Sequence, residues 1–376
     1  MSRNYKRIIS IVSGASADGL SAIIVKISKD LSFDITDSHS FEYPTEIKNL
    51  ITKCARNQAN TSEICHLNFV LGEIFAKCAE EIIKKSGIEK YNIDFISAQG
   101  QTIYHIPTEQ TISGVSTRAT LQIGDISVIS ERTGILTVGD FSSKDIAAGG
   151  QGAPLAPFAD EIIFGRKKNR GILNINNITN ITVLSPSVPT FAFDIGPGNI
   201  FINYFTKMLF NKDIDFNGKI ASQGNIDEQL LRFMMTHEYY SKCPPKLANF
   251  EIFDENYAQQ VYKNAIKVPS NIITTVTAQC AYAIYDAYKK FIEPKVELEE
   301  IVLGGDGASN DMLKTYLSRL LPNILFTTHI DYGIDNNFKE ALAYAYLGYM
   351  TLGNKCNNIP GATGARHGVC MGKISY

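Results

Sequence analysis

The stretch "RIISIVSGASADGLSAIIVKI", residues 7–27, places two runs rich in β-branched residues on either side of a short break. Gly14, Asp18 and Gly19 interrupt the apolar pattern between the runs. Runs of this kind form strands, and glycine with aspartate marks a turn. The stretch therefore predicts a β-hairpin at the start of the chain.

A second stretch of the same kind, "RGILNINNITNITVLSP", covers residues 170–186. Asn176 and Asn177 lie between its two β-rich runs, and asparagine is among the few residues other than glycine that accept a positive φ. Mixed strands and helices follow each hairpin, which favours a duplicated α/β design with a cleft between two halves.

The elements around the hairpins follow from periodicity and turn residues. Residues 62–87 carry apolar side chains at three- and four-residue spacings and end in Lys84, Lys85 and Gly87, which predicts an amphipathic helix. Short buried strands are predicted at 93–100 and 136–140. From residue 191, we expect a strand, a Gly-Pro-Gly turn and then a helix; over 297–310, a strand, a turn and a helix; and over 338–353, a helix.

Length and charge limit the function classes. The 376 residues favour two domains, at roughly 150 residues per domain. With 36 basic and 38 acidic residues, the chain has no overall field to hold nucleic acid or an anionic membrane, so we expect a small-molecule partner. The apolar run "IISIV" is too short for a signal peptide or a membrane span, and we expect a cytoplasmic protein.

The seven cysteines are scattered and contain no CxxC pair. This pattern indicates neither a disulfide framework nor a zinc site, and we expect reduced, structural thiols. His105 and His367 lack a partner at metal-ligand spacing, so both are interpreted as structural and no protein metal site is predicted.

Four glycine-rich turns follow predicted strands, near Gly14, at Gly149–Gly152, at Gly196–Gly198 and at Gly304–Gly307. Turns of this kind can present backbone N–H groups to phosphate, although each one alone is more often an ordinary turn. Four in one chain favour a nucleotide site. No GxxxxGK[ST] or strand-linked GxGxxG motif is present, which argues against P-loop and Rossmann sites.

Acids follow several of these strands and leave two interpretations open. Asp18, Asp140, Asp145 and Asp194 could hold a metal–phosphate group or act as a base. Each is equally plausible as a cap or turn residue, because aspartate readily hydrogen-bonds its own backbone.

Eight motifs occur in an order and spacing that resemble one known family: "VSGASADGLSAIIVKI", "GQTIYHIPT", "LQIGD", "ERTGILTVGDF..KDIAAGGQGAPLAP", "FDIGPGN", "PPK", "LGGDGASN" and "KEALAYAYL". The chain is identified by them as a divergent member of the anhydro-N-acetylmuramic acid kinase family, in the sugar kinase, heat-shock chaperone and actin superfamily. The resemblance covers nearly the whole chain. It implies an α/β fold of two ribonuclease H-like (actin-like ATPase) domains around a central cleft, the first formed by residues 1–138 with 351–376 and the second by 139–350.

The resemblance also implies the chemistry. ATP with Mg²⁺ phosphorylates O6 of a 1,6-anhydro sugar while water opens the anhydro bridge, most simply converting 1,6-anhydro-N-acetylmuramic acid to N-acetylmuramic acid 6-phosphate, a step of peptidoglycan recycling. Such a reaction needs a base that activates water and a clamp for the triphosphate. The base implied by the resemblance is Asp145.

The other implied roles divide into two sets. The residues implied for nucleotide binding are Ser13, Gly14, Ala15, Ser16, Asp18, Gly19, Asn176, Asn177, Asp194, Gly196, Gly198, Asn199, Gly304, Gly305, Gly307 and Asn310. The residues implied for sugar binding are Gln101, Thr102, Gly149, Gly150, Gln151 and Glu340. A homodimer is left open.

Several positions depart from the family pattern. The Gly-Thr-Ser turn reads Gly14-Ala15-Ser16, the arginine-rich stretch before Asp145 reads Ser142-Ser143-Lys144, and Asn176-Asn177 replaces two glycines. Because serine cannot replace an arginine fork that pairs with a carboxylate, an anhydro sugar without the lactyl arm, such as levoglucosan, is an alternative substrate. A non-catalytic nucleotide-binding protein on the same fold is the other alternative.

Overall fold

The computed structural model describes residues 3–14, 17–248 and 252–376. It forms two compact units: Met1–Ile163 with Asn337–Tyr376, and Phe164–Asn336. These units differ from the division expected at residues 138 and 350. The segments 139–163 and 337–350 belong to the first unit, because Asp145 is hydrogen-bonded to Asn358 and Asp160 forms an ion pair with Lys339.

A six-stranded sheet organises the first unit, in the order β13-β7-β4-β1-β2-β3. Strand β2 is antiparallel to both β1 and β3, whereas β4 lies parallel to β1 and β7 lies parallel to β4. The strands of this unit are β1 Tyr5–Ser13, β2 Gly19–Ser28, β3 Phe33–Glu42, β4 Phe95–Gln99, β7 Thr137–Gly139 and β13 Lys373–Ser375, with a separate hairpin of β5 Gln101–Ile112 and β6 Val115–Ile123.

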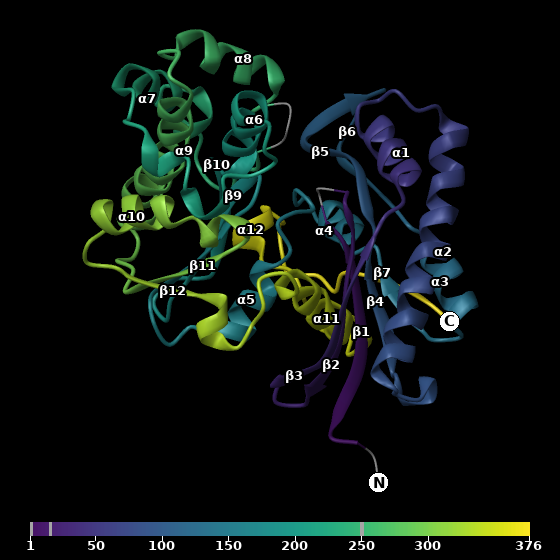
Figure 1. The fold of residues 1–376 in the computed structure, drawn as a ribbon. Helices are drawn as coiled ribbons and strands as arrows, with labels where there is room; N and C mark the ends of the chain where they lie inside the picture. Colours follow the sequence, from purple (N-terminus) through teal and green to yellow (C-terminus); the bar gives the residue numbers. More distant parts are fainter. Residues whose placement is uncertain (1–2, 15–16, 249–251) are drawn as a thin grey trace. The chain divides into compact units, whose positions relative to one another are not determined.

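Helices cover both faces of this sheet (Figure 1). In β4, Ile96 and Ala98 pack into the core that α2 completes, whereas Ser97 donates a hydrogen bond to the Tyr344 carbonyl of α11. Successive residues of a strand point to opposite faces, so α2 and α11 lie on opposite sides. The helices are α1 Thr45–Ala55, α2 Thr61–Ser86, α3 Ile126–Thr133, α4 Ser142–Ala147, α5 Pro157–Phe164, α11 Lys339–Leu352 and α12 Pro360–Thr363.

Sequence signals set the ends of α2. Asn60 and Glu63 form a capping box at its N-terminus, which satisfies two N–H groups that the first turn leaves without a partner. Gly87 ends the helix in the left-handed conformation at φ 67°. The amphipathic helix expected over residues 62–87 is therefore confirmed.

The second unit has a five-stranded sheet in the order β10-β9-β8-β11-β12. Strand β9 is antiparallel to both β8 and β10, whereas β11 is parallel to β8 and β12 is parallel to β11. The strands are β8 Arg170–Ile175, β9 Ile178–Leu184, β10 Phe191–Pro197, β11 Glu300–Gly304 and β12 Leu325–Thr328, and the helices are α6 Asn199–Phe210, α7 Glu228–Met235, α8 Glu255–Asn264, α9 Pro269–Ala287 and α10 Asp311–Leu320.

A buried ion pair joins two strands of this sheet. Arg170 on β8 lies opposite Glu300 on β11 and donates to it at 2.8 Å, with both side chains almost fully buried. Burial raises the pKa of Glu300, but hydrogen bonds from Tyr332, Thr327 and Arg170 outweigh burial and hold the pKa below its ordinary value. The pair joins β8 and β11 at the first position of their parallel register.

Numbered along each sheet, the first five strands of both units have the order 3-2-1-4-5, with the second strand antiparallel to its neighbours, and β13 adds a sixth strand at the edge of the first sheet. This is the ribonuclease H-like arrangement expected from the resemblance, and it occurs twice. The two predicted hairpins are β1–β2 and β8–β9, and each provides the first two strands of its sheet.

Candidate active site

Asp145 lies in the short helix α4, where the sequence predicted only a strand end and a loop. Its side chain is fully buried. Oδ2 accepts a hydrogen bond from the Gly152 N–H at 2.9 Å, and Oδ1 accepts from Asn358 Nδ2 at 2.9 Å and Thr363 Oγ1 at 2.7 Å. Three donors thus face the two oxygens and fix the orientation of the carboxylate, as suits an ion that only accepts.

The glycine loop after α4 wraps around this carboxylate. A Cβ at Gly150 would overlap Asp145 Oδ2, and the Gly150 N–H donates to the Asp145 carbonyl at 2.9 Å. Gln151 donates its N–H to the Thr363 carbonyl at 2.8 Å. Gly150 is therefore required by the close approach of the loop to Asp145 itself. The resemblance implies a sugar-binding role for Gly150, whereas the structure gives an internal reason for the glycine.

The C-terminal segment supplies two of the three donors to Asp145. Asn358 and Thr363 are 213 and 218 residues away in sequence. Sequence reasoning missed both, because an isolated Asn and Thr in a loop carry no pattern. Their proximity to Asp145 depends on the packing of the C-terminal segment against α4.

Ser13 and Gln101, predicted for nucleotide and sugar respectively, are bonded to each other. Ser13 Oγ donates to Gln101 Oε1 at 2.6 Å and lies 2.8 Å from the Tyr43 hydroxyl. All three side chains are buried, and burial raises the pKa of Tyr43. Thr102, the neighbour of Gln101, is exposed and donates to Gln122 at 2.9 Å. In this structure Thr102 is thus the more accessible of the two predicted sugar contacts.

The turn between β1 and β2 is described only in part. Ala15 and Ser16 lie outside the described residues. Gly14 accepts a hydrogen bond from the Ala17 N–H at 3.1 Å, and the Asp18 side chain is exposed. A Cβ at Gly19 would overlap the Phe41 carbonyl of β3, so Gly19 serves the pairing of strands. Asp18 remains available to a phosphate-bound cation.

Three predicted nucleotide turns meet in the second unit. The carbonyls of Asn176 and Asn177 accept hydrogen bonds from the N–H groups of Asn199 at 2.7 Å and Gly198 at 2.9 Å, at the start of α6. Asn176 Oδ1 accepts from the Asp306 N–H at 3.2 Å. The β8–β9 turn therefore lies between the turn after β10 and the turn after β11, as a shared nucleotide site would require.

The Asn176-Asn177 turn differs from its predicted conformation. Neither residue has a positive φ. Ile175 pairs with Thr179, so the turn spans three residues and does not need the left-handed pair of a two-residue hairpin. The expectation of left-handed asparagines was wrong.

Most glycines of these turns are required by packing within the unit. A Cβ at Gly198 would overlap the Asn176 carbonyl, and one at Gly305 would overlap Asn176 Oδ1. A Cβ at Gly307 would meet Ile175 and one at Gly304 would meet the His329 ring. Asn310 caps α10 by accepting the Leu313 N–H at 3.1 Å.

Asp194 lies in the bulge of β10 beside a buried lysine. Its Oδ2 accepts the Ala248 N–H at 2.8 Å, and burial raises the pKa of Asp194 to about 7. Burial lowers the pKa of Lys246 to about 8, and its ammonium lies 4.6 Å from the centre of the Tyr239 ring. Gly196 leaves room for the Tyr240 ring. Asp194 thus has partners inside the unit.

Glu340, predicted as a sugar contact, is exposed in the first turn of α11. The preceding residue, Lys339, is buried and forms an ion pair with Asp160 at 2.5 Å. This pair anchors the start of α11 and leaves Glu340 accessible.

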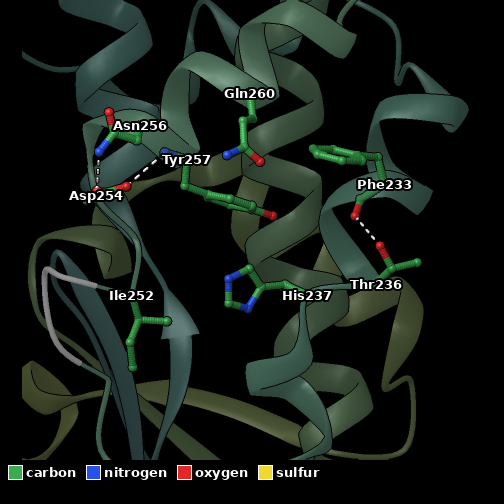
Figure 2. A pocket seen from close by; sticks show the side chains of 8 residues that line it. All are labelled: Phe233, Thr236, His237, Ile252, Asp254, Asn256, Tyr257 and Gln260. Carbon is green, nitrogen blue, oxygen red and sulfur yellow. Dashed lines mark hydrogen bonds between the residues drawn. The ribbon is translucent and has the colours of Figure 1, made fainter.

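An open pocket of about 480 Å³ lies elsewhere in the second unit, and Figure 2 shows its side chains. The His237 ring lies at its base, 4.9 Å from the centre of the Tyr257 ring, and its Nδ1 accepts the Tyr239 N–H at 3.2 Å. The residues predicted for nucleotide or sugar are not among those that line it. The pocket is therefore distinct from the predicted site.

Across residues 3–14, 17–248 and 252–376, there is no group of three His, Cys, Asp or Glu side chains that could hold a metal ion. Magnesium in kinases is usually held by one or two carboxylates together with substrate phosphates, so a dedicated protein cage is not needed. Within the same described segments, no helix combines the length and apolar character that crossing a membrane requires.

The family model for anhydro-N-acetylmuramic acid kinase matches residues 6–376. The chain belongs to the anhydro-N-acetylmuramic acid kinase family. Members of this family are carbohydrate kinases, as the resemblance predicted. A relative with that name from Caldanaerobacter subterraneus is 39% identical, covering 99% of this chain and 98% of its own, and one from Clostridioides difficile is 39% identical over 98% and 97%.

Solved structures show more distant likeness. Component A of the (R)-2-hydroxyglutaryl-CoA dehydratase from Acidaminococcus fermentans is 14% identical, with a TM-score of 0.45 over 91% of this chain and 96% of that one. A ROK hexokinase from Thermus thermophilus is 12% identical, with a TM-score of 0.37 over 91% and 99%.

Proposed function

We propose that this protein uses ATP to phosphorylate O6 of 1,6-anhydro-N-acetylmuramic acid while water opens the anhydro bridge. Water adds to C1, the bond from C1 to O6 breaks, and O6 takes the γ-phosphoryl group, which gives N-acetylmuramic acid 6-phosphate and ADP. Family membership along the whole chain carries this proposal.

Asp145 is the base in this proposal. Its carboxylate would accept the proton of the attacking water, and a positioned base of this kind contributes about 10²–10⁴-fold to rate. The three hydrogen bonds to Asp145 support the role, because a base must be held in one orientation. Asn358 and Thr363 are positioning residues on this account.

ATP would be held partly by the cluster of turns in the second unit. The exposed Asn176 and Asp306 form its accessible edge, where backbone can approach phosphate. The N–H groups of Gly198 and Asn199 are already bonded to the β8–β9 turn, so they fit phosphate less well in this structure. Bound Mg²⁺ would neutralise phosphate charge, and the exposed Asp306 beside this cluster is a carboxylate suited to it.

The test is a substrate panel with the full chain, ATP and Mg²⁺. The sugars are anhydro-N-acetylmuramic acid, anhydro-N-acetylglucosamine, levoglucosan and, as a control without an anhydro bond, N-acetylmuramic acid. A coupled ADP assay measures turnover, and mass spectrometry in ¹⁸O-labelled water locates the label.

We expect ADP release with anhydro sugars and one ¹⁸O atom at C1 of the product. Turnover only with levoglucosan would favour the alternative substrate. ATP binding by calorimetry without a phosphorylated product from any sugar would favour a non-catalytic nucleotide-binding protein.

A further inference from the structure

Two arginines meet the glycine loop beside Asp145. Arg118 on β6 donates to the Gly149 carbonyl at 2.9 Å, and the Arg366 guanidinium would lie 2.7 Å from a Cβ at Gly149. Neither arginine is close to this loop in sequence. Positive charge is thus present where the stretch before Asp145 carries Ser142 and Ser143 in place of arginine.

The two arginines differ in their partners. Arg118 donates to Glu109 at 3.0 Å and to the Pro107 carbonyl at 2.9 Å, so its charge is paired. Arg366 is exposed, and its guanidinium makes no hydrogen bond or ion pair within the described part of the chain. Arg366 is therefore the arginine with free donors.

The backbone holds Arg366 in place. Its N–H donates to the Ala148 carbonyl at 3.0 Å, and Thr363, three residues earlier, is bonded both to Asp145 and to Gln151. Three hydrogen bonds thus tie the segment that carries Arg366 to α4 and the glycine loop after it. These contacts fix the backbone of Arg366 close to Asp145, and its long side chain reaches Gly149 from there.

Arg366 and Asp145 approach neighbouring glycines of the loop. The guanidinium contacts Gly149 and the Asp145 carboxylate contacts Gly150, whose Cα atoms are neighbours in the chain. Summing these contacts with the Cα spacing places the guanidinium nitrogen no more than about 12 Å from the carboxylate oxygen. A gap within this bound can be spanned by one bound sugar that carries a three-carbon acidic arm.

We propose that Arg366 is a specificity residue that binds the carboxylate of the sugar's lactyl arm, and so selects an acidic anhydro sugar over a neutral one. The inference rests on the proposed function and names the feature of the substrate that the chain selects. Arginine pairs with carboxylate through two parallel hydrogen bonds, which a neutral sugar cannot form. Arg366 would also supply the guanidinium that Ser142 and Ser143 lack, the absence of which leaves levoglucosan as an alternative substrate.

The test compares Arg366→Ala, Arg366→Lys and a control, Arg232→Ala, at an exposed arginine of α7 in the other unit. KM and kcat are measured for anhydro-N-acetylmuramic acid and for anhydro-N-acetylglucosamine, which lacks the lactyl arm. A charged hydrogen bond contributes about 1.5–3 kcal/mol, which corresponds to roughly 10–150-fold in KM.

We expect Arg366→Ala to raise KM for the acidic sugar by that factor, with kcat and the kinetics of the neutral sugar within about twofold. Arg366→Lys should recover part of the affinity, and Arg232→Ala should match the wild type. Equal losses for both sugars, or no loss for either, would overturn the inference while leaving the proposed function intact. Absence of product from wild-type protein with every anhydro sugar would instead overturn the proposed function.

Discussion

Replacing Asp145 by asparagine separates the two tasks that the structure gives this carboxylate, catalysis and attachment of the C-terminal segment. Three donors face its oxygens: Gly152 on Oδ2, and Asn358 and Thr363 on Oδ1. In either orientation an amide turns its own N–H groups toward at least one of these donors. One buried group then loses its partner, which costs about 1–3 kcal/mol.

The expected consequence is a folded but weaker protein with little activity. A loss of this size lowers the melting temperature by about 2–4 °C per kcal/mol for a unit of this size. Turnover with the best anhydro sugar should fall by about 10²–10⁴-fold at a temperature well below the transition. Urea unfolding and the coupled ADP assay measure the two effects on the same preparation.

Thr363→Val is the matched control, because it removes one donor to Asp145, together with the acceptor of the Ala365 N–H, and keeps the carboxylate. It should cost about 0.5–1.5 kcal/mol and reduce turnover by less than about tenfold. If Asp145→Asn keeps its turnover, or if both variants lose activity equally at equal stability, Asp145 is a structural anchor and the base lies elsewhere.

Three further predictions concern the second unit. Gly198→Ala should destabilise the protein by about 1–3 kcal/mol in urea unfolding, because its Cβ would overlap the Asn176 carbonyl; a neutral effect would show that the turn can relax. Asn176→Gly should weaken ATP binding in calorimetry, because it removes the acceptor of the Asp306 N–H in the turn after β11. Asn177→Gly is the control: it keeps its carbonyl contact and should bind ATP nearly as the wild type does. Tighter ATP binding by Asn176→Gly would contradict this role. Burial raises the pKa of Asp194 to about 7, so between about pH 4 and 7 the folded protein keeps a proton that the unfolded chain has lost. The free energy of unfolding should therefore fall as the pH rises through this range, by up to about 1.4 kcal/mol per pH unit. Asp194→Asn should flatten that slope, and an unchanged slope would assign it to another group.

The Asn176 prediction reverses what the sequence favours. From the sequence, glycine at the β8–β9 turn is expected to admit a phosphate and asparagine to obstruct it. In the structure the Asn176 side chain accepts a hydrogen bond from the neighbouring turn, and Gly305 in that turn leaves space for it. Which atoms occupy the space beside a glycine depends on chain segments far away in sequence.

The sequence by itself determined the elements and their class. The hairpins, the capped helix α2 and the strand ends at Gly100 and Gly304 follow from local periodicity and turn residues, because these signals act within a few residues. The motif order was sufficient to indicate the family. Local signals also placed Asp145 beside a glycine loop, although they did not predict the helix that carries it.

Only the tertiary structure decided which partners these residues have. Asn358, Thr363 and Arg366 reach the loop around Asp145 from more than 200 residues away, through packing of the C-terminal segment on α4. The unit to which residues 139–163 belong was decided in the same way. Which distant segments come into contact depends on the total burial and hydrogen bonding of the whole unit. The periodicity of a short stretch of sequence carries no information about those long-range contacts.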